Sequence, residues 1–593
     1  MKSKYKYSDQ LAIWLKNLGY THCFFLSGGN IMHIQESFRT KFKCIPVIHE
    51  VAAGIATEYF NETNNKSKAL ALVTAGPGIT NIMTAIGGAF LESREMLVLG
   101  GQVKTDDLSR NQLRQRGIQE INGVEIAKPI SNLSVRINKP IGFDKFKELV
   151  EIPKYKRKGP VFIEIPLDVQ GYPIEDIKYN KKNNFLKLNK TISFNTMKNK
   201  TNKILEILNN SKRPTILIGA GVTRETCNKI KKELRGLKIP IMLTWNASDR
   251  IGSEFSNYFG RPNTWGQRYS NIIIQQSDTL LAIGTRLGLQ QTGFNWKEFL
   301  KKGKIIHVEI DKRELNKKHP KTFMKVHADA NYILEQICKK KIKPHHQWIK
   351  YCQKIKNHFP LVENNNHTGK GFISPYVFYS KISKLAKKND VIIPCSSGGA
   401  FTTFNQTFEQ KLGQKIVNNK ALASMGYGLS GAIGAAFANQ NKRIIHFEGD
   451  GGFTQNLQEY GTVAINKLNM KSFIFCDDGY ASIRMTQKNY FNGAYMGCDI
   501  NTKLGIPNWK ILFKSWGVDI IKLTPNFEKN KKFIESFNSN GPNVYIVPID
   551  PLQTYFPKIS SRVTKTGSME SNPIHNMTPE ITKEEKDKFL KYI

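Results

Sequence analysis

Two acidic glycine turns in the last third of the chain have residue types that suit a cation and a diphosphate. An apolar, β-favouring run stops at Glu448–Gly452, where glycines let the backbone turn sharply beside a ligand. A second such run ends at Cys476–Tyr480, which places Asp477 27 residues after Asp450. Because parallel strands end at one edge of a sheet, we expect the two carboxylates to share one hard cation.

Magnesium prefers oxygen ligands in octahedral geometry and usually leaves some positions for phosphates. The side chains of Asp450 and Asp477 and a carbonyl near Gly479 would form half of such a shell. Diphosphate contacts are expected from the remaining turn residues, Gly449, Gly451, Gly452 and Tyr480. The alternative is two ordinary Asp/Gly turns after buried strands.

A GDG turn followed at this spacing by an acidic or amide residue and Gly-Tyr resembles the diphosphate motif of thiamine diphosphate enzymes. The resemblance implies thiamine diphosphate and Mg²⁺ as cofactors. The family usually has Asn where this chain has Asp477. An extra carboxylate there implies tighter metal binding or an altered pH dependence.

A single carboxylate, Glu50, opens an Ala/Gly-rich helical segment in the first third of the chain. It could merely complement the helix dipole. The His-Glu pair resembles the pyrimidine-binding half of the same family, in which the glutamate shares a proton with the aminopyrimidine ring and so assists deprotonation of thiazolium C2. Thr74–Asn81, a strand end, Gly-Pro-Gly turn and helix start, also matches, which implies that Gly76 and Asn81 contact the cofactor. A purely structural turn is compatible with that role.

Two loops resemble the substrate loops of the family. Ser27–Asn30, with His33 beyond it, looks like the loop that meets the substrate carboxylate or carbonyl, although Ser27 stands where Pro is usual. Asn30 and His33 are therefore candidates, and helix capping is the alternative for Asn30. Arg116–Glu120 resembles a loop of acetolactate synthases whose glutamine faces the second substrate, which makes Gln119 a candidate catalytic residue.

The third part of the chain has two more glycine-rich segments. Ser397, Gly398 and Gly399 follow a predicted strand and offer a hydroxyl and amides to phosphate oxygens. Ala423–Leu429 resembles the family's GxMGYGLP segment. That implies Met425 as the wedge that bends the cofactor and the carbonyl of Ala423 as acceptor for its amino group. Met425 as plain core filler is the alternative.

The acceptor side departs from acetolactate synthases. Residues 483–491 lack the tryptophan that gates the substrate in those enzymes, and Arg484 and Gln487 lie where the acceptor would be selected, with a solvated loop as the alternative. Pyruvate-decarboxylase-type members use a His-His pair near the loop that corresponds to Arg116–Glu120, and no such pair occurs near that loop in this chain. Its absence favours carbon–carbon bond formation over release of an aldehyde.

Strand and helix patterns alternate along the chain and predict three doubly wound α/β domains with parallel sheets. We expect a pyrimidine-binding domain over 1–172, a central domain over 195–345 and a diphosphate-binding domain over 370–555. The predicted strands are Cys23–Leu26, Leu70–Thr74, Met96–Leu99, Val161–Ile165, Pro214–Ile218, Ile239–Leu243, Thr279–Ile283, Ile305–Ile310, Val391–Pro394, Arg443–Phe447 and Ser472–Phe475.

A linker is expected from about Tyr172 to about Asn195, and a tail over 556–593 shows no clear strand pattern and a short final helix. The tail could be a lid or a partner-facing segment. In the central domain, Gly219–Gly221 and Gly284–Leu287 resemble the part of acetolactate synthases that holds flavin adenine dinucleotide, so this flavin is a further candidate cofactor. Residues 288–293 lack the acidic and basic residues of the biosynthetic enzymes, which argues against branched-chain amino-acid synthesis.

The 593-residue chain carries a formal net charge of +40, so nucleic acid has to be considered as a partner. The lysines are scattered through every segment, which favours a solvated basic surface instead. Eight cysteines form no CxxC pair and no metal-ligand spacing, which fits a reducing cytoplasm. The N-terminus is typical of an amphipathic helix rather than a signal peptide, and no apolar run reaches membrane-spanning length.

The resemblance implies a carboligase like acetolactate synthase, which transfers an acyl carbanion from pyruvate or a similar 2-oxo acid to a carbonyl acceptor. A keto-sugar nucleotide is one candidate acceptor. The alternatives are a decarboxylase that releases an aldehyde and a non-catalytic protein that binds cofactor or nucleic acid. Because the two halves of the cofactor site come from different subunits in this family, a homodimer or homotetramer is implied.

Overall fold

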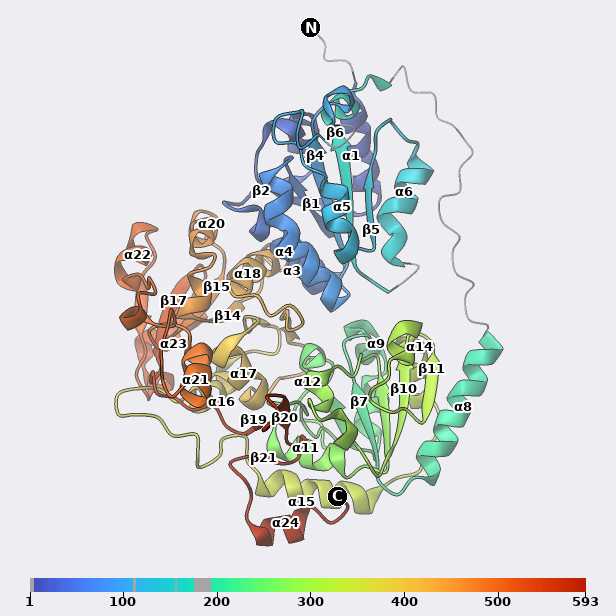
Figure 1. Cartoon of the computed structure of the whole chain (residues 1–593), viewed down its shortest axis with the longest axis vertical. Coiled ribbons are helices and arrows are strands. Elements are labelled where there is room, and N and C mark those ends of the chain that lie inside the picture. The colour runs from blue at the N-terminus through green and yellow to red at the C-terminus, as the bar shows by residue number, and fades with distance from the viewer. Residues whose placement is uncertain (1–4, 110–112, 155–156, 175–193) are drawn as a thin grey trace.

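The computed structural model describes residues 5–109, 113–154, 157–174 and 194–593. Three α/β lobes lie around a common junction, with the first domain (blue) above the third (yellow to orange) and the second (green) (Figure 1). Each lobe is built on one parallel sheet, as the alternation of strands and helices predicted. The linker predicted between Tyr172 and Asn195 lies mostly outside the described residues.

The first domain has a six-stranded sheet in the order β2-β1-β3-β4-β6-β5. Its strands are β1 Tyr20–Phe25, β2 Lys43–Pro46, β3 Lys68–Val73, β4 Met96–Gln102, β5 Leu133–Arg136 and β6 Pro160–Pro166. Its helices are α1 Tyr7–Asn17, α2 Met32–Arg39, α3 Glu50–Thr63, α4 Pro77–Glu92, α5 Gly123–Ala127, α6 Phe143–Glu151 and α7 Leu167–Gln170.

The third domain repeats this strand order in its own sheet, β13-β12-β14-β15-β17-β16. Its strands are β12 Val391–Ile393, β13 Lys415–Ile416, β14 Ile444–Gly449, β15 Met470–Cys476, β16 Ile520–Lys522 and β17 Asn543–Pro548. Its helices are α16 Pro375–Leu385, α17 Gly398–Thr407, α18 Tyr427–Ala438, α19 Asp450–Phe453, α20 Tyr460–Ile465, α21 Ala481–Tyr490, α22 Trp509–Ser515 and α23 Lys531–Asn538.

The second domain has a five-stranded sheet in the order β11-β10-β9-β7-β8. Its strands are β7 Pro214–Ile218, β8 Ile241–Leu243, β9 Thr279–Ile283, β10 Lys304–Glu309 and β11 Met324–His327. Its helices are α8 Phe194–Asn210, α9 Arg224–Lys229, α10 Lys231–Gly236, α11 Arg268–Gln275, α12 Leu289–Thr292, α13 Lys312–Asn316 and α14 Ala330–Cys338, and α15 His346–His358 leads toward the third domain.

Each strand order contains a point where the chain reverses direction across the sheet, and ligands of open α/β sheets bind at the carboxyl edge beside such a point. In the first domain it lies between β1 and β3, in the second between β7 and β9, and in the third between β12 and β14. The glycine-rich segments singled out in the sequence follow these strands. The topology therefore places them where a doubly wound fold can bind a ligand.

The prediction of a tail without strands was wrong. Residues after 556 form β18 Lys558–Ile559 paired with β21 Met577–Thr578, and the hairpin of β19 Ser561–Val563 and β20 Met569–Ser571. These strands are two or three residues long, too short for a periodic pattern to reveal them. The predicted final helix is present as α24 Lys583–Phe589.

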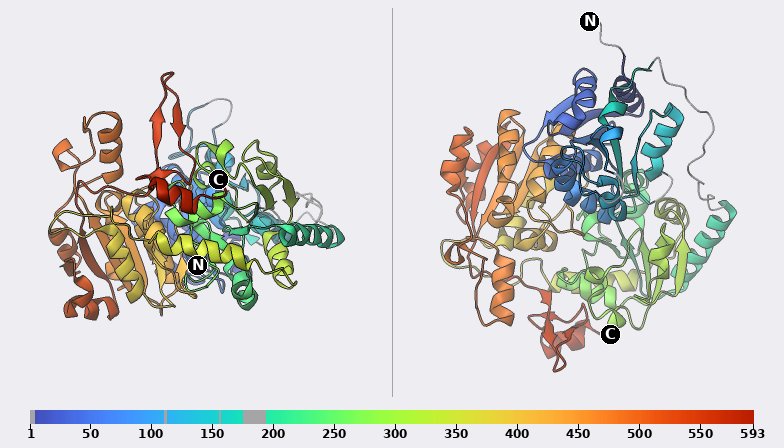
Figure 2. Two further views of the ribbon diagram at one scale, coloured as in Figure 1. Left: turned by 90° about the horizontal axis from the view of Figure 1, so that it is seen from below. Right: turned by 45° about the horizontal axis from the view of Figure 1, so that its top comes forward.

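The tail packs on the second domain rather than closing over the first. Ile574, Met577 and Phe589 share a hydrophobic cluster with the second-domain residues Tyr269 and Ile272. The β19–β20 hairpin projects from the body of the molecule (Figure 2). Most of the tail is thus anchored, and the hairpin is its protruding part.

Helices α3 and α18 join the first and third domains at close range. An added Cβ at Gly434 would lie 2.0 Å from the carbonyl oxygen of Ala56, and one at Gly431 would lie 2.7 Å from the ring of Tyr59. A single hydrophobic cluster runs through both domains across this contact. The two domains therefore share a core, and the absence of side chains at these glycines permits the approach.

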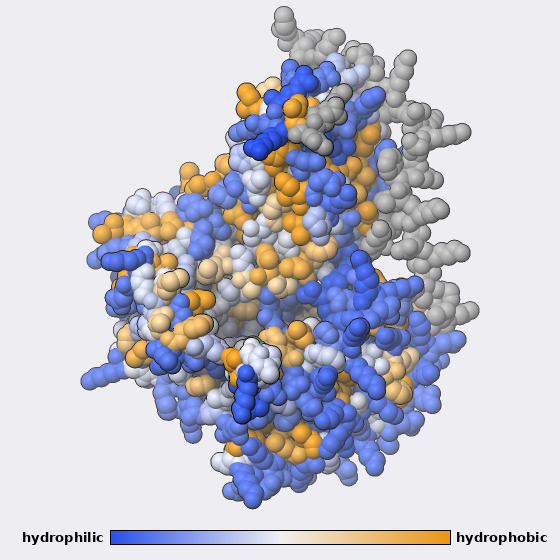
Figure 3. Space-filling view, viewed as in Figure 1, coloured by the Kyte–Doolittle hydropathy of each residue, from blue (hydrophilic) through white to orange (hydrophobic). Residues whose placement is uncertain are grey.

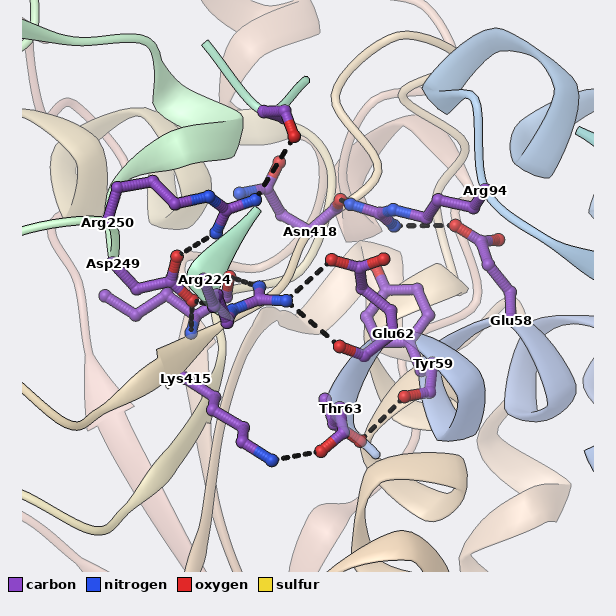
Figure 4. Close-up of polar contacts among 12 residues, drawn as sticks. Glu58, Tyr59, Glu62, Thr63, Arg94, Arg224, Asp249, Arg250, Lys415 and Asn418 are labelled. Atoms are coloured by element: carbon purple, nitrogen blue, oxygen red, sulfur yellow. Dashed lines mark hydrogen bonds and ion pairs between the residues drawn. The ribbon is translucent and has the colours of Figure 1, made fainter. Parts of the chain in front are cut away.

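A buried polar network ties all three domains at their junction (Figure 4). Arg94 donates to Glu58 at 2.6 Å and to the carbonyl of Asn418 at 2.6 Å, so the first and third domains are joined. Arg224 of the second domain pairs with Glu62 at 2.7 Å and with Asp249 at 2.6 Å. Because removing one partner would leave a buried charge uncompensated, these pairs favour one relative placement of the domains.

The surface is mixed in polarity. In the space-filling view, apolar side chains gather on the part of the first domain that faces the hollow where the three domains meet (Figure 3). Within the described part of the chain, no helix has the length and apolar character needed to span a bilayer.

We expect Gly434→Ala to destabilise the protein although alanine is the better helix former. The added methyl group would meet backbone, which cannot rotate away, so repacking should cost about 1–3 kcal/mol and lower the melting temperature. Gly236→Ala in α10 is the matched control, because nothing lies within 4 Å of its added Cβ. Equal melting temperatures for the two variants would contradict the role given to the α3–α18 contact.

Candidate functional site

The two acidic turns lie side by side at the carboxyl edge of the third sheet. Strands β14 and β15 are parallel neighbours in which Gly449 is opposite Phe475, so Asp450 and Asp477 follow at the same edge. Both side chains are buried, at 1% and 7% exposure. The predicted juxtaposition of the two carboxylates is therefore present.

The carboxylate of Asp450 is held by backbone N–H groups. Its Oδ1 accepts from Gly451 at 2.7 Å, and its Oδ2 accepts from Asp477 at 3.2 Å and from Asp478 at 2.9 Å. Asp450 thus bridges the two turns. These bonds fix its orientation while leaving lone pairs for a cation.

The electrostatics of the pair suit a divalent cation. Burial, and then the charge of Asp477, raise the pKa of Asp450 well above its usual range. Burial also raises the pKa of Asp477 to about 7, against the opposing effect of Arg484. Two buried acids that repel each other are stabilised by a shared cation, and their oxygens are the donors that Mg²⁺ prefers.

Within the described residues, no group of three or more His, Cys, Asp or Glu side chains could hold a metal ion by itself. A cation here would therefore need further oxygen donors, such as the carbonyl of Gly479 and phosphates of a ligand. This is the donor set that the sequence predicted.

Glycine is required at two positions of these turns. Gly479 has φ +145°, and an added Cβ would lie 2.3 Å from the carbonyl oxygen of Cys498. An added Cβ at Gly451 would lie 2.4 Å from the ring of Tyr480. The Tyr480 hydroxyl accepts from Gln455 at 3.0 Å, so the second turn is packed onto the first.

The N-terminus of α17 faces the same sheet edge from β12. Ser397 is its N-cap, Gly398 has φ +80°, and an added Cβ at Gly399 would lie 2.4 Å from the ring of Tyr555. Free N–H groups at a helix start attract phosphate oxygens. Ser397, Gly398 and Gly399 thus lie at the switch point with the acidic turns.

The Ala423–Gly426 loop enters α18 with two left-handed residues, Ala423 at φ +58° and Gly426 at φ +75°. The carbonyl of Gly426 accepts from Asn456 at 2.9 Å, which ties this loop to the segment after the first acidic turn. Met425 is 41% exposed. The alternative of plain core filler therefore does not apply to Met425 in the chain as described.

In the first domain, Glu50 and Asn81 meet. Glu50 is 4% exposed at the start of α3, and its Oε2 accepts from Nδ2 of Asn81 at 2.9 Å. His49 caps the helix through Nδ1, which accepts from the N–H of Val51 at 3.2 Å. The structure thus joins the two residues that the sequence assigned to the pyrimidine half of the site.

The third domain holds the backbone just before Glu50. Oε1 of Glu459 accepts from the N–H groups of Ile48 at 3.0 Å and His49 at 2.9 Å. Burial raises the pKa of Glu459 to about 7. Glu459 was not singled out in the sequence, because nothing local marks a glutamate that bonds to a segment over four hundred residues away.

Gly76 and Gln119 are in contact. Gly76 has φ +62°, and an added Cβ would lie 2.6 Å from the carbonyl oxygen of Gln119. Gln119 itself has φ +63°, a strained conformation for a residue with a side chain. The carboxylate of Glu120 accepts from Arg116 at 2.9 Å and from Gly117 at 3.1 Å, which holds the loop in place.

The Ser27–Asn30 loop lies beside the Thr74 turn, because an added Cβ at Gly28 would lie 2.4 Å from Cβ of Thr74. The carbonyl of Asn30 accepts from Gln170 at 2.8 Å. Asn30 lies inside a short 3₁₀ turn capped by Gly28, and the N-cap of α2 is Ile31, so the capping alternative for Asn30 was wrong.

The side chain of His33 lies toward the end of α7. Its Nε2 would lie 2.9 Å from a Cβ added at Gly171, so the ring packs against the end of α7. Burial lowers the pKa of His33, and the charge of Lys6 lowers it further. The structure therefore brings Gly76 and Gln119 together but directs His33 toward the α1–α7 side of the domain.

The segment after the second turn is a helix rather than a loop. Residues 481–490 form helix α21, so the solvated-loop alternative was wrong. Arg484 is 7% exposed and donates to Oδ1 of Asp477 at 3.1 Å, whereas Gln487 is exposed and bonds to Met496. Arg484 thus contacts the acidic site, while its expected place in acceptor selection stays a prediction.

The comparisons with known proteins match all three domains. Residues 5–126 match the N-terminal TPP binding domain of thiamine pyrophosphate enzymes, residues 201–337 their central domain and residues 397–547 their C-terminal TPP binding domain.

Several curated relatives resemble the chain over most of its length. A probable acetolactate synthase large subunit of Methanococcus aeolicus is 27% identical over 521 residues, which is 85% of each chain. The large subunit of acetolactate synthase isozyme 1 of Escherichia coli K12 is 25% identical over 91% of this chain and 93% of its own. The mitochondrial catalytic subunit of acetolactate synthase of Saccharomyces cerevisiae is 24% identical over 94% of this chain and 82% of its own.

We expect the Glu459 carboxyl to make the stability depend on pH. Its pKa of about 7 in the fold lies above the ordinary value of 4.5, so the folded state keeps a proton that the unfolded state releases. Stability should therefore fall as pH rises from about 5 to 8, by at most about 3 kcal/mol. Glu459→Gln keeps the acceptor oxygen and removes the proton.

As the pH rises from 5 to 8, the melting temperature of Glu459→Gln should therefore increase relative to that of the wild type. A difference between the two proteins that stays constant over this range would refute the assignment.

Proposed function

This chain belongs to the thiamine pyrophosphate enzymes, and we propose that it is a thiamine diphosphate- and Mg²⁺-dependent carboligase similar to acetolactate synthase. It would decarboxylate pyruvate or a similar 2-oxo acid and join the remaining acyl group to a carbonyl acceptor. The observation that supports this most is the pair of buried carboxylates, Asp450 and Asp477, side by side at the carboxyl edge of the sheet in a domain of this family.

The diphosphate end of the cofactor would bind the third domain. Asp450, Asp477 and the carbonyl of Gly479 are the proposed Mg²⁺ ligands. The proposed diphosphate contacts are Ser397, Gly398, Gly399, Gly449, Gly451, Gly452 and Tyr480. These residues lie on the turns after β12, β14 and β15, whose N–H groups and glycines allow close approach of an anion.

The pyrimidine end would bind between two chains. One chain would supply Glu50, Gly76 and Asn81, and the other would supply the Ala423–Met425 loop. Asn81 donates to Glu50 and so orients its carboxyl group toward a ligand. We assign to Glu50 the proton shared with the ring nitrogen, to the carbonyl of Ala423 the acceptance of an amino hydrogen, and to Met425 the wedge beneath the bent cofactor.

When bound, thiamine diphosphate supplies an electron sink that makes decarboxylation of a 2-oxo acid feasible. The side chains of this protein would then position the substrates. Gln119 is the proposed contact to the acceptor, because its strained backbone beside Gly76 is held by the Glu120 clamp. Asn30 is proposed at the donor, and His33 is kept only as a more distant candidate since its ring packs on Gly171.

The acceptor is proposed to be unusual, with a keto-sugar nucleotide as one candidate, because the signatures of the biosynthetic acceptor site are missing from the sequence. A non-ligating decarboxylase is the second candidate function. A non-catalytic protein that binds cofactor or nucleic acid is the third.

Flavin adenine dinucleotide stays a candidate for the second domain. The glycine turns after β7 and β9 lie at its switch point. They also pack on each other, since an added Cβ at Gly219 would lie 2.2 Å from the carbonyl oxygen of Gly284, so the contact alone accounts for these glycines. Visible absorption of the purified protein tests this cofactor.

We further propose a homodimer or homotetramer in the cytoplasm, with active sites between chains. Apolar residues at or near the proposed site are exposed in the single chain, among them Met425 at 41%, Ile118 at 86% and Met496 at 80%. A second copy that covers them would complete the site.

Product analysis tests the proposed reaction. The purified protein with Mg²⁺ and thiamine diphosphate should consume pyruvate and give, by mass spectrometry, a product enlarged by a two-carbon unit when the correct aldehyde, keto-acid or keto-sugar acceptor is present. Free acetaldehyde with no acceptor requirement would favour the decarboxylase. No turnover with any donor or acceptor, together with salt-sensitive binding of DNA, would favour the non-catalytic alternative.

Hybrid oligomers test both the site residues and the shared site. Glu50→Gln and Asp450→Asn should each be inactive, because one removes the proton-sharing carboxyl and the other a metal ligand. Hybrids of the two variants, purified with two different tags, should regain about half of the wild-type activity, since one site per dimer keeps both groups. An active monomer by sedimentation equilibrium, or hybrids without activity, would contradict the shared site.

A further inference from the structure

Helix α21 directs one arginine back onto the second acidic turn. The helix begins directly after Tyr480, and Arg484 lies in its first turn, where its N–H bonds to the carbonyl of Tyr480 at 3.0 Å. From there, Nη2 of Arg484 donates to the backbone carbonyl of Asp477 at 2.6 Å and to its Oδ1 at 3.1 Å. Both side chains are 9% exposed, so water screens this ion pair little.

The two carboxylates of the site have different partners. Asp450 accepts from backbone N–H groups, which carry no net charge. Asp477 is paired with a guanidinium, which is always protonated. The Asp477–Arg484 pair is therefore neutral as a unit, and Asp450 is left as the uncompensated buried charge of the site, with the exposed Asp478 beside it.

The Arg484 guanidinium also has one donor group that is not used by Asp477. Its buried Nε–H has no hydrogen-bond partner among the residues that the structure describes. A buried donor without an acceptor is unfavourable and is usually satisfied by a ligand or by water. Helix α21 packs against α17, whose first turn carries the proposed phosphate-binding residues Gly398 and Gly399.

We propose that Arg484 is a positioning residue that neutralises Asp477, lowers the negative charge of the metal–diphosphate site by one, and donates through Nε to an anionic oxygen of the bound diphosphate. The inference rests on the cofactor site of the proposed function. It assigns to Arg484 a role toward the cofactor, in place of acceptor selection.

Opposite charge effects follow from this arrangement. Arg484→Met leaves two uncompensated carboxylates, so a divalent cation should bind roughly tenfold more tightly and a diphosphate more weakly. Asp477→Asn leaves the guanidinium unpaired, so the cation should bind roughly tenfold more weakly. In the double variant D477N/R484M the two effects on the cation should cancel.

The readout is binding, without turnover. Mn²⁺ is titrated into cofactor-free protein and the free ion is followed by electron paramagnetic resonance, and thiamine diphosphate is titrated at saturating Mg²⁺ by calorimetry. Arg484→Lys keeps the charge without the guanidinium fork, so Mn²⁺ affinity should stay close to that of the wild type while thiamine diphosphate binds more weakly. Arg562→Met, which breaks an exposed pair with Glu570, is the control and should change neither affinity.

The outcomes separate the two proposals. Wild-type protein that binds no thiamine diphosphate at saturating Mg²⁺ would overturn the proposed function. The role of Arg484 would be overturned if the wild type binds thiamine diphosphate but the Mn²⁺ affinities of R484M and D477N shift in the same direction, or if the Mn²⁺ affinity of R484M does not shift. The ion pair would then be purely structural. If R484M does not fold, the comparison of D477N, D477N/R484M and R484K decides in the same way.

Discussion

The crossing of α3 and α18 is the contact on which the rest of the arrangement depends. Glu50 is the first residue of α3, and Gly426 caps α18 immediately after Met425, so both helices begin at proposed site residues. Their approach through Gly431 and Gly434 fixes how the edges of the first and third sheets are oriented. The hydrophobic cluster across this contact and the hydrogen bond from Tyr427 of α18 to Glu58 of α3 stabilise it. A rigid joint fixes how each chain presents its two half-sites, which an active site shared between two chains requires.

The first and third domains share one strand order, and each has its glycine-rich turns on both sides of its switch point. This repetition explains why the candidate residues fall into two sets. One set is dominated by a buried glutamate with its amide partner, Glu50 and Asn81, and the other by paired aspartates with helix N-termini. The first set suits a ring that exchanges protons, and the second suits a metal and its phosphates.

Burial gives the site its electrostatic character. The acidic groups at the proposed site have few water contacts, and each is matched by an N–H group, an arginine or an amide. Asp450 has backbone donors, Asp477 has Arg484, Glu50 has Asn81 and Glu459 has the backbone before α3. A carboxylate in such surroundings is oriented, and it keeps lone pairs for a cation or a cofactor.

The sequence by itself determined the fold class and most of the local structure of the site. Strands β7 and β9 were predicted to the residue, because fully buried parallel strands are continuous apolar runs between turn signals. The edge strands β5, β11, β13 and β16 and the tail strands were missed, because runs of two to four residues are too short for a periodic pattern to reveal them, and the inner strand β17 was missed as well. The glycine turns at Asp450, Gly479 and Gly76 were also visible, because sharp backbone geometry demands glycine locally.

Only the tertiary structure decided which side chains meet. That Arg484 pairs with Asp477, that Glu459 holds the backbone before Glu50 and that His33 turns toward Gly171 depend on contacts between segments distant in the sequence or on the direction in which a helix presents a side chain. Met425 lies exposed because its loop enters α18 through left-handed residues, which periodicity does not reveal. Residue types and spacing encode the turns, whereas partners follow from packing, which sums weak contacts over the whole chain.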